Sequence, residues 1–182
     1  MAGYSIFIDG AAGTTGLRIR QRLAARSEIA LLELDEASRK DADKRLAAIA
    51  QADLSILCLP DAAAKEIVAQ ASPAARICYA STAHRTSPGG VYGFPELSGR
   101  YAAVQQASRV SVPGCHATGF LALAAPLVEH GYLAADSQLY CHSLTGYSGG
   151  GKQMIAAYED PTRPEGYASP REYGLAMQHK HL

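Results

Sequence analysis

The sequence predicts an α/β fold, with an N-terminal Rossmann-type parallel sheet that carries helices on both faces and is followed by the start of a second α/β domain. Two observations predict it. Short apolar runs alternate with helical stretches through the first half of the 182-residue chain, as in parallel sheets joined by helical crossovers. A glycine-rich turn at residues 10–16 directly follows the first apolar run, which is typical of dinucleotide-binding folds.

The predicted elements follow in order along the chain. Strands are expected over residues 4–9, 29–34, 54–59, 76–80 and 110–112, and helices over 13–26, 41–50 and 61–70. After about residue 114 an apolar helix is expected over 115–131, then a strand over 138–144 and a proline-rich irregular loop over 161–170. We therefore expect an NADP-binding domain over 1–114 and a catalytic and substrate domain over 115–182, incomplete at its C-terminus.

The composition excludes several classes of protein. Lys plus Arg and Asp plus Glu are both 17, so the chain lacks the basic surplus that nucleic acids or anionic membranes require. No apolar run approaches the roughly 20 residues that span a bilayer. No cysteine belongs to a C-x-x-C pair and no cluster has metal-ligand spacing, so no metal site is predicted. The first residues lead into a strand pattern instead of a signal peptide, so we expect a cytoplasmic protein with reduced thiols.

The glycine-rich turn predicts where a nicotinamide dinucleotide binds. Glycines allow a tight turn close to a pyrophosphate, and the helix that follows offers N–H groups and the positive end of its dipole. The spacing is G-x-x-G-x-x-G, and the alternative is a glycine-rich turn without a ligand. The cofactor-binding residues predicted in this turn are Gly10, Ala12, Gly13, Thr14, Thr15 and Gly16.

The end of the second predicted strand indicates which nucleotide binds. A basic residue there favours the 2′-phosphate of NADP, and an acidic one favours the free ribose hydroxyl of NAD. Ser38 and Arg39, with Lys40 beside them, are predicted to bind the 2′-phosphate, so we expect NADP(H) as the cofactor. In the alternative, Glu33 or Asp35 holds the ribose of NAD and the basic pair is a solvated helix start.

Cys115 is the candidate nucleophile. It follows Pro113 and Gly114 at the start of the apolar helix, where the helix dipole favours the thiolate over the thiol. That is the setting a cysteine nucleophile needs. The alternative is a buried small residue, which is the interpretation favoured for Cys58 and Cys78 because both lie in apolar strand runs.

Six segments, found in this order along the chain, together resemble the short form of N-acetyl-gamma-glutamyl-phosphate reductase. The resemblance implies a Rossmann-type NADP domain and a second α/β domain with dimer contacts, in a homo-oligomeric enzyme of arginine biosynthesis. Family members are longer, so a missing C-terminal part would complete the second domain. The segments are Gly10–Gly16, Ala80–Arg85, Tyr92–Leu97, Pro113–Cys115, Ser148–Lys152 and His179–His181.

The resemblance also implies the chemistry. The Cys115 thiolate would attack the acyl carbon of N-acetylglutamyl phosphate, phosphate would leave, and NADPH would reduce the resulting thioester to the semialdehyde. A general acid/base is needed for the proton, and the family match makes the pair His179 and His181 the candidates, without deciding between them. Surface histidines near a chain end are the alternative for this pair, and His116 is a second candidate beside the nucleophile.

The substrate carries a phosphate and a carboxylate, which require cationic and hydroxyl donors. Arg85, with Ser81 and Thr82, is predicted to bind these groups because a guanidinium binds such anions in a bidentate way. A backbone nest at Ser148, Gly149 and Gly150 is predicted to lie near the nicotinamide or the phosphate. A solvated arginine and a plain flexible turn are the respective alternatives.

Two departures from the family pattern bear on these predictions. Tyr79 stands where the family usually has an aspartate, and the chain ends at Leu182 before the Pro-Glu that usually follows the paired histidines. The rival hypotheses are an enzyme like aspartate-semialdehyde dehydrogenase, with the same thioester chemistry, and a truncated nucleotide-binding fragment without activity. A cysteine hydrolase is a third, but it would have no use for the glycine turn.

Overall fold

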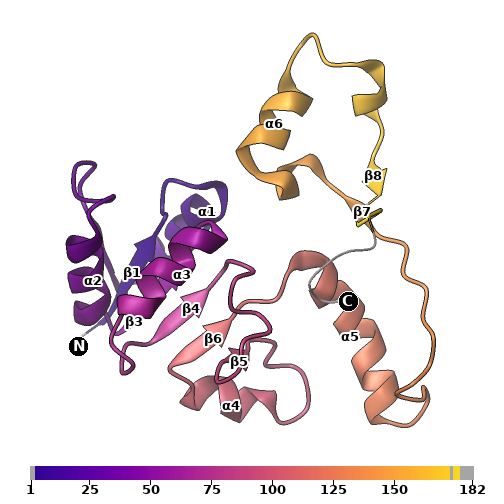
Figure 1. Cartoon of the computed structure of the whole chain (residues 1–182), viewed down its shortest axis with the longest axis horizontal. Coiled ribbons are helices and arrows are strands. Elements are labelled where there is room, and N and C mark those ends of the chain that lie inside the picture. Colours follow the sequence, from indigo (N-terminus) through magenta and orange to yellow (C-terminus); the bar gives the residue numbers. More distant parts are fainter. Residues whose placement is uncertain (1–2, 173, 177–182) are drawn as a thin grey trace.

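The N-terminal part of the chain is built on a six-stranded parallel sheet (Figure 1). The computed structural model describes residues 3–172 and 174–176. All of the pairings in this sheet are parallel, so the α/β prediction is confirmed. Its strands, in spatial order, are β2 (Ile29–Leu32), β1 (Tyr4–Asp9), β3 (Leu54–Leu57), β4 (Ile77–Tyr79), β6 (Arg109–Ser111) and β5 (Val91–Tyr92).

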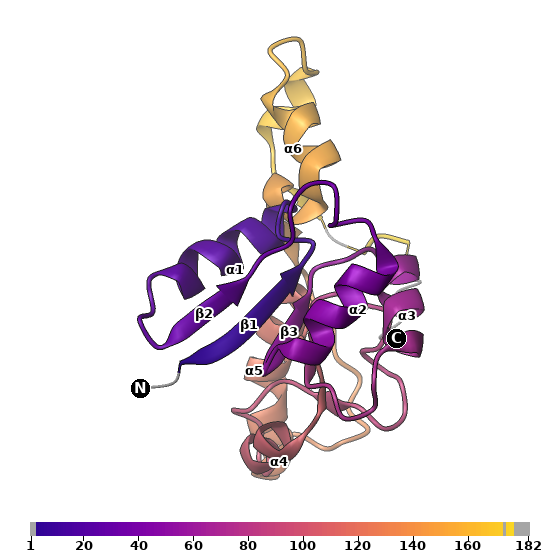
Figure 2. The ribbon, with the colours of Figure 1, turned by 90° about the vertical axis from the view of Figure 1, so that its left-hand side faces the viewer.

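Helices cover both faces of the sheet. Figure 2 shows α1 (Thr14–Ala24) on one side of β1, and α2 (Ala42–Gln51) and α3 (Asp61–Gln70) on the other. This division follows from the chain path, because right-handed crossovers that run in opposite directions along a sheet lie on opposite faces. A further helix, α4 (Arg100–Gln106), precedes β6.

The hydrophobic core lies between the sheet and the helices α2 and α3. Leu57 of β3 is fully buried, and Ile67 of α3 and Ile77 of β4 are 1% exposed. Tyr79, which stands where the family usually has an aspartate, belongs to the same cluster and is buried. At this position the chain therefore has a core side chain, and burial raises the pKa of its hydroxyl.

The sheet has a switch point between β1 and β3, where ligands of open α/β folds bind. The chain leaves β1 through α1 toward β2 on one side, and β3 pairs with β1 on the other. Gly10 follows β1 at this point with φ +82°, and a Cβ there would lie 2.3 Å from the carbonyl oxygen of Cys58. A side chain at residue 10 is excluded both by backbone conformation and by space.

The part of the chain after residue 114 is less tightly packed. None of its described helices contains a buried residue, and Figure 1 shows α5 and α6 extending away from the sheet. The described helices include none that is long and apolar enough to cross a membrane. Its elements are α5 (Cys115–Glu129), β7 (Leu144–Thr145), the 3-10 helix η1 (Tyr147–Gly150), α6 (Gly151–Glu159), the 3-10 helix η2 (Glu165–Ala168) and β8 (Arg171–Glu172).

The strand expected over residues 138–144 is wrong. Residues 138–143 form no strand, and only the two residues of β7 pair, antiparallel to β8. A strand needs a neighbour for its backbone N–H and C=O groups. Within the described residues, β8 is the neighbour of this segment, and it reaches only Leu144 and Thr145.

Candidate active site

Cys115 is the first residue of α5 and is exposed. The chain leaves β6 at the carboxyl edge of the sheet and turns at Pro113 and Gly114 into the helix. Gly114 is the N-cap, with an extended backbone and no side-chain hydrogen bond. The thiol therefore stands at an open helix N-terminus, where the dipole favours a negative charge.

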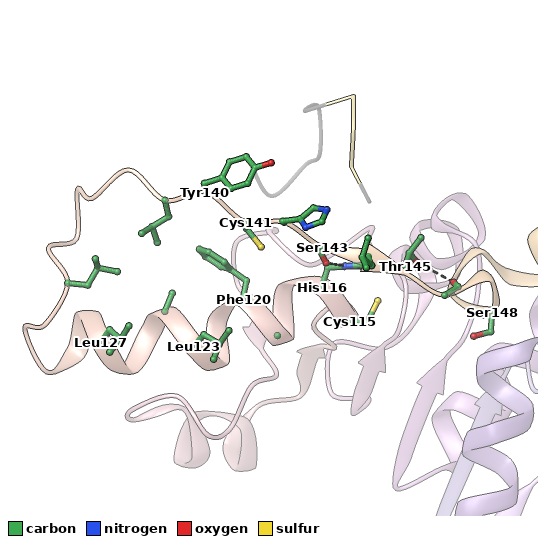
Figure 3. A pocket seen from close by; sticks show the side chains of 18 residues that line it. Cys115, His116, Phe120, Leu123, Leu127, Tyr140, Cys141, Ser143, Thr145 and Ser148 are labelled. Carbon is green, nitrogen blue, oxygen red and sulfur yellow. Dashed lines mark hydrogen bonds between the residues drawn. The ribbon is translucent and has the colours of Figure 1, made fainter. Parts of the chain in front are cut away.

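A groove of about 840 Å³ runs from Cys115 along α5 (Figure 3). One wall is α5, and the other is the chain from residue 139 to 146. His116 forms a hydrogen bond with Ser143 across the groove. Ser148 and Gly149 border the groove, so two residues of the predicted nest share a cavity with Cys115. The apolar side chains along the groove include Phe120, Leu123, Leu127, Leu139 and Tyr140.

A second cavity of about 580 Å³ lies at the switch point, against the turn from Gly10 to Gly13. Helix α1 begins just beyond this turn without a side-chain cap, so its first N–H groups are available to a ligand. Gly16 lies in the first turn of α1, where a Cβ would come 2.3 Å from the carbonyl oxygen of Gly10. The helix can therefore approach the turn closely, as a pyrophosphate site requires.

The charges in this cavity leave a positive surplus. Asp9 is buried, and Arg45 binds it with a hydrogen bond of 2.8 Å from Nε. The Nη2 atom lies 2.8 Å from the same oxygen but is not aligned for a hydrogen bond. Burial raises the pKa of Asp9, and the interactions with Arg45 oppose that shift. Lys40 and Lys152 also line the cavity, and neither forms an ion pair with a described carboxylate.

The predicted 2′-phosphate residues are already engaged within the chain. Ser38 is buried, and its hydroxyl accepts a hydrogen bond of 2.8 Å from Lys44 Nζ. Arg39 lines the cavity but pairs with Glu36 at 2.7 Å. The sequence did not predict a role for Lys44, because its hydrogen bond to Ser38 depends on the conformation of the turn before α2.

Glu33, one of the two residues of the NAD alternative, lines the same cavity. Its carboxylate accepts a hydrogen bond of 2.6 Å from Arg20 Nε in α1. That hydrogen bond lowers the pKa of Glu33. Glu33 is thus already paired with a cation, and Asp35, the other candidate, accepts a hydrogen bond from the N–H of Ser38.

The three residues predicted to bind the substrate follow β4. The hydroxyl of Ser81 is buried without a described partner, and Thr82 donates its N–H and its hydroxyl to Asp61 at the start of α3. Arg85 donates to the carbonyl oxygens of Val112 and Ala80. None of the three predicted residues lines the groove of Cys115 or the cavity at the glycine turn.

The glycine-rich segment at Ser148–Lys152 borders both cavities. Ser148 and Gly149 line the groove of Cys115, and Lys152 lines the cavity at the glycine turn. Gly150 is the N-cap of α6, which begins at Gly151 with φ +72°. The structure therefore brings this segment close to both the predicted nucleophile and the predicted cofactor turn.

The predicted acid/base pair, His179 and His181, lies outside the described residues. Two of the described histidines form side-chain hydrogen bonds: His116 contacts Ser143, and His142 contacts Glu172 at 3.0 Å. Within residues 3–172 and 174–176, no group of three or more His, Cys, Asp or Glu side chains could hold a metal ion.

Comparison with known proteins identifies the relatives of this chain. Residues 115–182 match the family model of the semialdehyde dehydrogenase dimerisation domain. The chain is 50% identical over 179 residues to the N-acetyl-gamma-glutamyl-phosphate reductase 2 of Pseudomonas putida, an alignment that covers 97% of this chain. It is 46% identical over 184 residues to the N-acetyl-gamma-glutamyl-phosphate reductase of Burkholderia orbicola, with 100% of this chain covered. The chain is a homologue of the N-acetyl-gamma-glutamyl-phosphate reductases.

The resemblance seen in the sequence is thereby confirmed. The chain spans 57% of the length of the Pseudomonas reductase and 59% of the Burkholderia reductase. Among solved structures, the aspartate semialdehyde dehydrogenase of Francisella tularensis superposes with a TM-score of 0.61 at 12% identity, over 85% of this chain and 48% of that one. Aspartate semialdehyde dehydrogenase II of Vibrio cholerae gives 0.62 at 16% identity, over 88% of this chain and 52% of that one. These likenesses support the fold.

Proposed function

We propose that this polypeptide carries the cofactor site and the nucleophile of an NADPH-dependent N-acetyl-gamma-glutamyl-phosphate reductase of arginine biosynthesis. The observation that carries the proposal is the position of Cys115. It is exposed at the uncapped start of α5 and shares a groove with Ser148 and Gly149, and the same glycine-rich segment reaches the cavity at the switch point through Lys152. Homology to named reductases supplies the substrate.

In the proposed mechanism the Cys115 thiolate attacks the acyl carbon of N-acetylglutamyl phosphate. The carbon–sulfur bond forms first and gives a tetrahedral oxyanion, which then expels inorganic phosphate and leaves a thioester. The backbone N–H of Cys115 at the helix start stabilises the oxyanion. Bound NADPH supplies the hydride that reduces this thioester. The thiohemiacetal then releases the semialdehyde, with His179 or His181 as the proposed acid/base.

We propose NADP(H) as the cofactor, bound at the turn from Gly10 to Gly16. The residues present suit its phosphates, because the uncapped start of α1 directly follows the turn from Gly10 to Gly13, which lines a cavity to which Lys40 and Lys152 add positive charge. The pairing of Glu33 with Arg20 weakens the case for NAD. Within this proposal Arg39 releases Glu36 and binds the 2′-phosphate instead. Ser38 and its partner Lys44 form the base of that site.

The proposal includes three further points. Residues 1–114 form the NADP-binding domain, and residues 115–182 belong to the catalytic and dimerisation domain of a cytoplasmic homo-oligomer, as the family match from residue 115 supports. Ser81 and Thr82 contribute to the substrate side of the site. A different role is argued below for Arg85.

The test is the variant Cys115→Ala in an assay of N-acetylglutamate semialdehyde oxidation with NADP and phosphate. We expect a loss of about 10³-fold or more, as for other enzymes that lose their nucleophile, with NADPH affinity unchanged in a fluorescence titration. Activity near that of the unaltered chain would refute the mechanism. Assaying both acyl phosphates, N-acetylglutamyl and aspartyl, separates this proposal from an aspartate-semialdehyde dehydrogenase.

A second candidate function is nucleotide binding without catalysis. It is favoured by the fact that the chain spans only 57–59% of its named relatives. If the unaltered 182-residue chain binds NADPH but oxidises no semialdehyde in the presence of phosphate, this second function is the correct one for the chain by itself.

A further inference from the structure

Arg85 connects the loop after β4 to the loop that precedes Cys115. Its Nε donates a hydrogen bond of 2.9 Å to the carbonyl oxygen of Val112, and its Nη2 donates one of 3.2 Å to that of Ala80. Val112 is three residues before Cys115 and 27 residues from Arg85. One guanidinium therefore joins the ends of two neighbouring strands at the carboxyl edge of the sheet.

The guanidinium also occupies the space beside Gly114. A Cβ at residue 114 would lie 2.8 Å from Arg85 Nη1, and the next two atoms it would meet, at 3.5 and 3.8 Å, also belong to Arg85. The backbone of Gly114, with φ −73° and ψ 153°, is one that any residue adopts. A side chain at residue 114 would thus meet the guanidinium of Arg85, whereas the backbone conformation there does not demand a glycine.

Other hydrogen bonds hold the residues on either side of the turn at residues 113 and 114. The N–H of Val112 donates to the carbonyl oxygen of Tyr79, and the hydroxyl of Ser111 donates to that of His84. Beyond the turn, Thr118 donates to the carbonyl oxygen of Gly114. Between these anchors, Arg85 lies against Gly114 and binds the carbonyl oxygen of Val112 directly before the turn.

We propose that Arg85 is a positioning residue for Cys115, which holds the turn before the nucleophile and places a permanent positive charge beside the N-terminus of α5. A guanidinium stays charged at all ordinary pH values, so that of Arg85 adds to the positive end of the helix dipole at the start of α5. Two of its nitrogens are bonded to carbonyl oxygens, so this role differs from the anion binding predicted from sequence. The inference rests on the proposed function in that it takes Cys115 as the nucleophile.

The experiment measures the alkylation rate of Cys115 by iodoacetamide near pH 7, resolved by peptide mass spectrometry in the full 182-residue chain. We expect Arg85→Met to slow it about five- to tenfold. Arg85→Lys should restore part of the rate, because an ammonium keeps the charge but cannot reproduce the planar fork. Cys141, also exposed, serves as the reference thiol in each digest. Arg100→Met, an exposed arginine at the start of α4, is the matched control and should change nothing.

Gly114→Ala tests the contact between Arg85 and residue 114 by changing residue 114 instead of the arginine. The added methyl must displace the guanidinium, which is the mobile end of a long side chain, so this variant should slow alkylation of Cys115 by about the same factor as Arg85→Met. In the double variant Arg85→Met/Gly114→Ala the rate should be no lower than with Arg85→Met alone, because the two changes remove one interaction. Gly166→Ala, where a Cβ would meet no atom within 4 Å, is the matched glycine control.

Several outcomes would overturn the proposal. They are an unchanged rate in Arg85→Met, additive effects in the double variant, or an equal slowing of Cys115 and Cys141, which would show that the effect is not specific to Cys115. If Arg85→Met fails to fold by circular dichroism, Arg85→Lys and Gly114→Ala carry the test. Alkylation needs no turnover, so a chain without reductase activity would refute the proposed function while leaving this measurement intact.

Discussion

The ring of His84 packs against the ring of Tyr79 and is partly removed from solvent. Its ring lies 4.7 Å from that of Tyr79 between centroids, and its Nε2 is buried without a described hydrogen-bond partner. Burial, the largest effect, lowers the pKa of His84 below its ordinary value of 6.5. Burial favours the neutral form of the His84 ring, so protonation of this ring should lower the stability of the folded state.

We predict that His84 makes the chain less stable on mild acidification. Because the unfolded chain takes up the proton more readily, the stabilisation is present above about pH 6.5 and is lost as the pH falls toward the lower pKa of the folded state. In His84→Phe, which keeps an aromatic ring on Tyr79, the urea midpoint should depend less on pH between 7 and about 5. His130→Phe, at an exposed position, should keep the original dependence. Parallel curves for the unaltered chain and His84→Phe would contradict this prediction.

At the scale of single elements, α5 and β3 differ in how far their apolar side chains are buried. Both are apolar, but β3 contains the fully buried Leu57, whereas Leu123 of α5 is 76% exposed and no residue of α5 is buried. Apolar area removed from water stabilises the fold by roughly 25 cal/mol per Å². The stability of the chain therefore resides in its sheet.

We predict that two identical substitutions have very different effects. Leu57→Ala should lower the free energy of unfolding by about 2–5 kcal/mol, because it leaves a cavity in the core. Leu123→Ala should change it by no more than about 0.5 kcal/mol. Urea unfolding at two protein concentrations measures both. A loss of more than about 2 kcal/mol for Leu123→Ala would mean that α5 is covered in solution, and a dependence on concentration would identify a second copy as the cover.

Most elements of the sheet could be predicted because each leaves a local signal. The runs at 4–9 and 54–59 are mostly apolar and are followed by Gly10 and Pro60, and the helix at 61–70 was predicted with the bounds that the structure shows. β5 has only two residues, and α6 follows directly on a run of glycines, so neither has a pattern long enough to detect. The segment 138–144 has the composition of a strand, but pairing depends on a partner elsewhere in the chain.

At the scale of the whole molecule, the same distinction applies to the candidate site. Cys115 and the glycine turn are signalled by a few adjacent residues, and the structure places each beside a cavity. The bonds of Arg85 to Val112 and Ala80 depend on β4 and β6 being neighbours in the sheet. No local pattern contains that pairing, so the sequence alone could not predict that Arg85 links two loops.

The position of the segment from Ser148 to Lys152 between two cavities also follows only from the folded chain. Ser148 and Lys152 are four residues apart and face different ligand spaces. Carboxamidomethylation of Cys115 should therefore change the dissociation constant for NADPH, by about fivefold or more, and Lys152→Ala should reduce that effect. Equal dissociation constants before and after the modification would show that the two spaces are independent. If the constants differ, the segment from Ser148 to Lys152 acts as a shared wall between the two cavities, and a group bound in one of them changes the space available in the other.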